Sequence, residues 1–168
     1  MHLDVISGRY SPAVWDEGGG PDFFEIEIGN HVARSALFSP PGPHFLALQA
    51  RWLPYYPEEL RQARLAMVRA ACAYDLDQVA FFAGRGLHFQ AFDRLYKAFQ
   101  EFLQALFIRR RVYPIAYNKW IREQVEGWLG EPGLCRQLPA LISVADIEGS
   151  QPLERAHALR ALLDEWTA

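Results

Sequence analysis

The sequence predicts a mainly α-helical protein: an antiparallel helical bundle built on one long αα-hairpin, preceded by a small N-terminal α/β piece with two short strands. Large apolar residues recur at steps of three and four over two stretches of roughly 24 to 28 residues, the spacing that lines one face of a helix. The turn Gly84-Arg85-Gly86 separates the two stretches, so we expect the helices to fold back on each other. Short β-branched or alternating runs near the N-terminus predict the strands.

The N-terminal piece, residues 1–42, holds both predicted strands. Residues 3–6 are partly β-branched and end at a Ser-Gly turn. The run Glu25-Ile26-Glu27-Ile28 alternates strictly, which in a strand places both glutamates on one face. These carboxylates form either a solvated sheet face or one side of a site for a hard cation such as magnesium. Because the chain begins inside an apolar run, we consider that this piece is the end of a longer domain.

Residues 43–168 are predicted to form the helical bundle domain. The proline-rich loop at residues 39–43 separates it from the N-terminal piece, because each proline removes a backbone donor. The predicted helices begin near Phe45, at Pro57, at Gly86, at Pro114, at Leu134 and at Ser150, and three of these starts carry a proline in the first turn.

Composition narrows the possible partners and the location. A formal net charge of -3 argues against nucleic acid and an anionic membrane as dedicated partners. Cys72 and Cys135 are too few for a disulfide scaffold, and neither belongs to a CxxC pair. No apolar run of about 18 residues and no secretory signal pattern is present. We therefore expect a cytoplasmic protein with no membrane partner.

The chain carries no complete catalytic motif of the GxSxG, HExxH or GxxxxGK[ST] type, so the residues alone leave enzymatic activity undecided. Asp75 and Asp77 look like a metal-binding pair. On a helix, however, residues two apart point about 200° away from each other, so they cannot share a metal.

The strongest local signal is a basic and aromatic run at residues 109–120. One interpretation is a phosphate- or substrate-binding pocket, because guanidinium groups match phosphate oxygens and aromatic faces stack on bases. The other is structural ion pairing: three successive arginines spread around the helix, so at least one must face a neighbouring helix and need a partner. The candidate residues are Arg109, Arg110, Arg111, Tyr113, Tyr117 and Lys119.

Residues 106–120, LFIRRRVYPIAYNKW, resemble the segment LF-x-x-N-R-x-Y-x-P-x-x-K-W of bacterial polymerase-beta-like nucleotidyltransferases, the superfamily of aminoglycoside and lincosamide nucleotidyltransferases. That segment belongs to the helical domain that follows their catalytic domain. Residues 33–42 and 56–60 resemble two upstream segments of the same proteins, gr-x-L-x-D-P-x-G and Y-P-x-x-L. The resemblance thus covers residues 3–129, through short motifs.

The same resemblance implies which functional parts are missing. Such enzymes carry a Gly-Ser turn and an Asp-x-Asp pair upstream, and this chain shows neither before Asp4. Asp4, Glu25 or Glu27 is then the candidate third carboxylate. The chain resembles the C-terminal, substrate- or nucleotide-contacting helical portion of a nucleotidyltransferase. This resemblance implies that the chain is not catalytic alone. It implies magnesium and a nucleoside triphosphate as cofactors only if the catalytic half is present.

The implied partners are a nucleotide and either a catalytic-domain partner or a second copy of this chain. The alternative belongs to another functional class of protein: a stand-alone helical interaction or dimerisation module without enzymatic activity.

Overall fold

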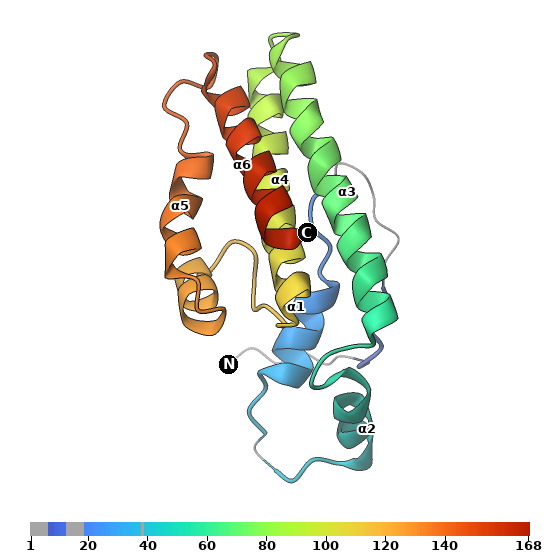
Figure 1. The fold of residues 1–168 in the computed structure, drawn as a ribbon. Coiled ribbons are helices and arrows are strands. Elements are labelled where there is room, and N and C mark those ends of the chain that lie inside the picture. The colour runs from blue at the N-terminus through green and yellow to red at the C-terminus, as the bar shows by residue number, and fades with distance from the viewer. Residues whose placement is uncertain (1–6, 13–18, 38) are drawn as a thin grey trace.

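The computed structural model is mainly helical (Figure 1) and describes residues 7–12, 19–37 and 39–168, which contain no strand. α3 and α4 form an antiparallel hairpin, α6 packs on both, and α5 lies beside α6. The predicted helical bundle is confirmed. In chain order the elements are α1 Phe24–Ile28, the π-helical turn η1 Gly29–Ala33, α2 Pro43–Trp52, α3 Glu58–Ala83, α4 His88–Arg110, the π-helical turn η2 Glu123–Trp128, α5 Pro132–Ile142 and α6 Gln151–Thr167.

Local signals in the sequence set the ends of the long hairpin. α3 begins directly after Pro57, with two acidic residues in its first turn, where they favour the positive end of the helix dipole. Gly86, at φ +71°, makes the turn to α4. α4 ends where Arg111 adopts the left-handed conformation, with φ +55°, and Val112 N–H donates back to the carbonyl of Phe107 at 3.1 Å.

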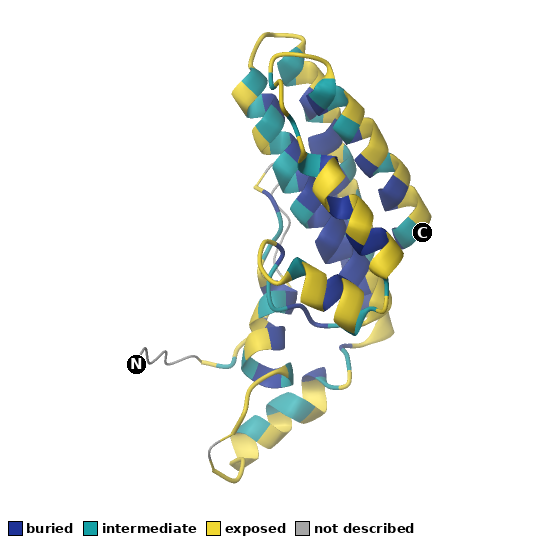
Figure 2. Cartoon of the chain, turned by 90° about the vertical axis from the view of Figure 1, so that its left-hand side faces the viewer, coloured by how far each residue is buried: buried dark blue, intermediate teal, exposed yellow. Residues whose placement is uncertain are grey.

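α4 is the central helix of the bundle. All its residues from Glu101 to Ile108 are buried, whereas the other helices keep an exposed face (Figure 2). The apolar stripe predicted for α3 packs against α4 and consists of Val68, Cys72, Leu76 and Val79, all buried. Among the described residues, no helix is both long and apolar enough to cross a membrane.

A second, smaller core joins the N-terminal piece to the bundle. Its rings make edge-to-face contacts, such as Phe24 against Trp52 with centres 5.5 Å apart. Gly29 permits close approach here, because a Cβ at this position would overlap the carbonyl oxygen of Pro114. The core draws residues from both sides of the predicted boundary at residue 42: Tyr10, Phe24, Ile28, Val32, Trp52, Tyr56 and Tyr113.

The strand predicted at residues 25–28 is wrong, because these residues lie in helix α1. Phe24, Ile28 and Val32 recur at steps of four and are buried together, so the helical period outweighs the four-residue alternation. The other predicted strand, residues 3–6, lies outside the described residues.

The helix predicted to start at Pro114 is also wrong in its first part. Residues 114–120 are not helical, and the helical turn begins only at Ile121. The buried side chain of Gln124 holds this loop by three hydrogen bonds to its backbone, which replace the bonds that a helix would make. Gln124 accepts from Ile115 N–H at 2.7 Å and donates to the carbonyls of Ala116 at 3.0 Å and Lys119 at 2.8 Å.

Candidate functional site

The three successive arginines at the end of α4 point to three different partners. The expectation that at least one of them needs a partner on a neighbouring element is met by all three, and each contact is at or near the surface. The partner of Arg111 belongs to α3, whereas the partners of Arg109 and Arg110 lie at the end of α6 and just before α5. In order, Arg109 Nε donates to the backbone oxygen of Ala168 at 2.8 Å, Arg110 Nη2 pairs with Glu131 Oε1 at 2.7 Å, and Arg111 Nη2 pairs with Glu58 Oε2 at 2.8 Å.

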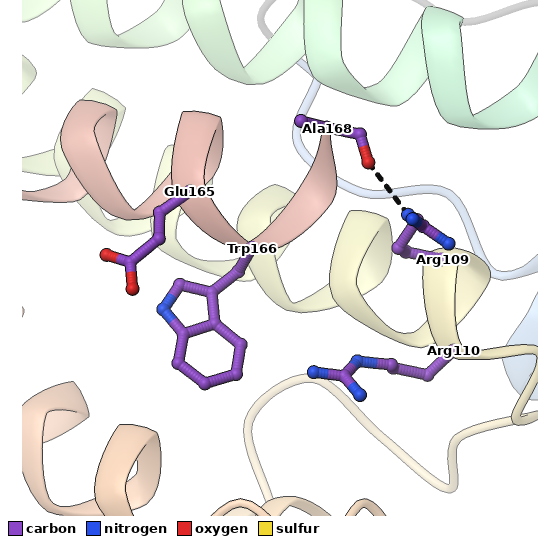
Figure 3. Close-up of a pocket in the computed structure, with 5 residues that line it drawn as sticks. All are labelled: Arg109, Arg110, Glu165, Trp166 and Ala168. Carbon is purple, nitrogen blue, oxygen red and sulfur yellow. Dashed lines mark hydrogen bonds between the residues drawn. The ribbon is translucent and has the colours of Figure 1, made fainter.

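Arg109 and Arg110 also line one open hollow, of about 400 Å³, with residues of α6 (Figure 3). Figure 3 shows the Arg110 side chain extending toward the indole of Trp166, and the guanidinium carbon lies 5.7 Å from the ring centre. Glu165 and Ala168 complete the lining. A guanidinium group carries five N–H donors, and the contacts above use one nitrogen of each arginine. Donors therefore remain for an anion in the hollow.

Cationic side chains outnumber carboxylates in the lining of this hollow. Two guanidinium groups and one carboxylate, that of Glu165, are among the side chains that line it, and Glu131 pairs with Arg110 from outside the lining. Paired guanidinium groups match the oxygens of a phosphate, and an indole face next to them can stack on a flat ring. The hollow can thus bind a phosphate group with an attached ring.

Tyr113 and Tyr117 lie in the protein interior, away from this hollow. The Tyr113 hydroxyl donates to the carbonyl of Trp52 at 2.9 Å and accepts from Tyr56 N–H at 3.0 Å. The Tyr117 hydroxyl has no hydrogen-bond partner in the described part of the chain. Burial raises the pKa of both phenols. Lys119 is exposed on the loop, so of the six predicted residues only Arg109 and Arg110 meet at the hollow.

Glu25, a candidate third carboxylate, is fully buried in an ion pair with Arg64 of α3. Arg64 Nε donates to its Oε1, and Arg64 Nη2 donates to Oε2 at 2.8 Å. Tyr56 OH and Gln104 Nε2 donate to the two carboxylate oxygens at 2.9 and 2.7 Å, and Asp22 shares the same Arg64 and Gln104 donors. Both oxygens of Glu25 are engaged, so this geometry gives it a structural role: it ties α1 to α3 and α4.

Glu27 faces away from Glu25 and is exposed, because residues two apart on a helix point in nearly opposite directions. The two glutamates therefore cannot share one metal ion. Glu27 lines a hollow of about 210 Å³ with His31 and residues 7–10. In the described ranges no three potential metal ligands of the His, Cys, Asp or Glu type come together, and Asp4 lies outside them.

Sequence reasoning missed one cluster of ionisable groups, the carboxyl groups of Asp75 and Glu101 between α3 and α4. Both are fully buried, and Arg94 pairs with Asp75 at 2.7 Å. Burial, and then the charge of Asp75, raise the pKa of Glu101 to about 9. The signal in the sequence that indicates this cluster is the position of Glu101, on the same helical face as the apolar residues of α4. As predicted, Asp75 and Asp77 point apart: Asp77 is on the surface, paired with Arg160 at 2.6 Å.

Trp166, beside Arg110, is a further residue of the hollow that is not among the candidates from the sequence. The described residues thus place two arginines at one polar hollow and hold two sets of buried charges. Comparisons of the chain with models of protein families, with curated proteins and with solved structures give no match.

Proposed function

We propose that this chain is the substrate- or nucleotide-contacting helical portion of a nucleotidyltransferase-like protein. In this proposal, the hollow of Arg109, Arg110 and Trp166 receives a phosphate-bearing nucleotide or substrate. The observation that supports it is the meeting of two successive arginines and an indole at one open hollow. Its volume of about 400 Å³ falls within the usual range for small-molecule sites.

The proposal assigns no catalysis to this chain alone. Glu25 is neutralised by Arg64, and Glu27 stands apart from it, so the carboxylates for magnesium come from a catalytic half or a partner. Magnesium and a nucleoside triphosphate are then cofactors of that complete protein, which would transfer a nucleoside monophosphate to an acceptor hydroxyl. The contribution of this chain is to position the phosphate. We place the protein in the cytoplasm.

The test is calorimetric titration of ATP into the wild type, Arg110→Ala and Arg111→Ala. The two substitutions each remove one positive charge and one surface ion pair, but only Arg110 lines the hollow. Loss of a charge-assisted hydrogen bond costs about 1.5 to 3 kcal/mol, so we expect Arg110→Ala to weaken ATP binding roughly 10- to 100-fold. Arg111→Ala should bind like the wild type. Equal weakening by both variants, or no binding to any of them, contradicts the proposal.

One feature favours the alternative, a helical dimerisation module without enzymatic activity. The hairpin end exposes the large apolar side chains of Phe81, Leu87 and Phe89, the last being 81% exposed. A cluster of this kind fits an interface with a second copy of the chain. Light scattering on the calorimetry samples separates the two functions, since a monomer that binds ATP supports the first. A dimer that binds no ATP, and that Phe89→Ser dissociates, supports the second.

A further inference from the structure

A second hollow, of about 300 Å³, lies between α4, α5 and the loop that leads from α4 into η2. Its walls are mainly apolar. On the α4 side the rings of Tyr96 and Phe99 are nearly parallel, with centres 6.4 Å apart and planes 15° apart. At about 30 Å³ per water molecule the hollow has the volume of roughly ten waters, near the lower end of the range for small-molecule sites. A single flat ring with small substituents fits this space.

Two polar side chains line this hollow, and one lining residue carries a backbone carbonyl that lacks its usual helical donor. Arg122 is the one charged residue among the described side chains that line it, and its contact with Glu126 is long, at 3.5 Å, and exposed. Asn118 contributes an amide. The third group is the Cys135 carbonyl, whose usual helical donor is missing because Pro139, four residues later, has no N–H. A helical carbonyl points along the axis toward that later residue, and Cys135 and Pro139 both line the hollow.

The backbone between Asn118 and Arg122 is strained. Trp120 has φ +51°, in the left-handed region that a bulky residue rarely adopts, although its side chain is 58% exposed and gains little from packing. The three hydrogen bonds from buried Gln124 hold the loop in this conformation. Strain that the surrounding structure maintains concentrates at binding and catalytic sites.

We propose that this second hollow binds a small aromatic carboxylate that also carries a hydrogen-bond donor. The ring lies against Tyr96 and Phe99, the carboxylate pairs with Arg122, and the donor binds the Cys135 carbonyl. Apolar walls and a single guanidinium group exclude a polyphosphate. This site shares no lining residue with the hollow of Arg109 and Arg110, so the inference is independent of the proposed function.

Cys135 lines the hollow and is 7% exposed, so the reactivity of its thiol reports whether the hollow is occupied. The probes are 4-hydroxyphenylacetate and its neutral analogue, 4-hydroxyphenylacetamide, and the readout is the rate of Cys135 alkylation by iodoacetamide, followed by peptide mass spectrometry. Cys72, fully buried in the bundle core, reports unfolding in the same sample. A probe of about eleven heavy atoms binds with a roughly millimolar Kd at the usual ligand efficiency. We expect the carboxylate to protect Cys135 at such concentrations and the amide only at about tenfold higher ones.

Two exposed arginines provide matched variants. Arg122 lines the hollow, whereas Arg136, on α5, does not. Arg122→Ala should abolish the preference for the carboxylate, and Arg136→Ala should keep it. Saturation-transfer NMR with the same probes and variants gives a second readout that does not depend on thiol reactivity. The proposal is overturned if neither probe binds, if both bind equally well to the wild type, or if Arg136→Ala and Arg122→Ala weaken binding equally.

Discussion

Tyr113 and Tyr117 are equally buried, each 3% exposed, but only the hydroxyl of Tyr113 makes hydrogen bonds among the described residues. The Tyr113 hydroxyl joins the backbone before α3 to the end of α2, through the carbonyl of Trp52 and the N–H of Tyr56. The Tyr117 hydroxyl is an unpartnered polar group in the core, among the described residues. The two phenols therefore contribute to stability in opposite ways.

Tyr113→Phe should lower the free energy of unfolding by about 2 to 3 kcal/mol, because a donor and an acceptor of the backbone lose their partner in the interior. Tyr117→Phe should be neutral or stabilising by up to about 1 kcal/mol, since it removes a buried hydroxyl and no hydrogen bond. Urea denaturation of both variants checks this difference. A loss of equal size in Tyr117→Phe would show that its hydroxyl has a partner in solution.

At this scale the sequence predicted that at least one of the arginines needs a partner, because three successive side chains spread around the helix. It could not identify those partners. Glu58 and Glu131 lie 53 and 21 residues away from the arginines they bind. Only the packing of the hairpin and α5 brings them into reach.

At the scale of the elements, hydrophobic periodicity predicted the secondary structure correctly where the pattern covered many residues. The stripes of α3 and α4 each span many turns, and the hairpin was predicted nearly to its ends. In α1 the alternation covers four residues only, and the buried Glu25 obscured the helical face. Its burial depends on Arg64, 39 residues later in the chain. Such compensation of a buried charge is a tertiary property that a local pattern does not contain.

The loop at residues 114–120 depends on one side chain, Gln124. Gln124→Ala should lower the free energy of unfolding by about 2 to 4 kcal/mol, because three backbone groups lose their partners. It should also increase the rate of amide hydrogen exchange within this loop, and α3 and α4 should remain the slowly exchanging helices. Hydrogen-exchange mass spectrometry measures the effect. Glu123→Ala, at the exposed neighbouring position, is the control and should leave the loop protected.

At the scale of the whole molecule, two buried polar clusters lie along the central helix α4. The first contains Arg64, Glu25 and Gln104 and attaches the N-terminal piece to the bundle. The second lies within the hairpin, where Arg94 pairs with Asp75, and the charges of Arg94 and Lys97 both act on Glu101. Neither Glu101 oxygen has a donor in the described structure, and neither does Asp75 Oδ2. A proton on Glu101 removes a buried charge and its repulsion by Asp75, and it supplies a hydrogen bond to Asp75.

Stability should therefore depend on pH through Glu101. Its pKa is about 9 in the folded chain, against an ordinary value of 4.5, so the stabilisation is complete below about pH 4.5 and is lost as pH rises toward 9. We expect the free energy of unfolding to fall by up to about 1.4 kcal/mol per pH unit between pH 5.5 and 8.5. In Glu101→Gln, whose amide stays neutral and can still donate to Asp75, this decrease should disappear. Urea denaturation at a series of pH values measures both slopes, and Glu59→Gln, at an exposed position of α3, should follow the wild type. Parallel curves for the wild type and Glu101→Gln would mean that Glu101 holds no proton in the folded bundle.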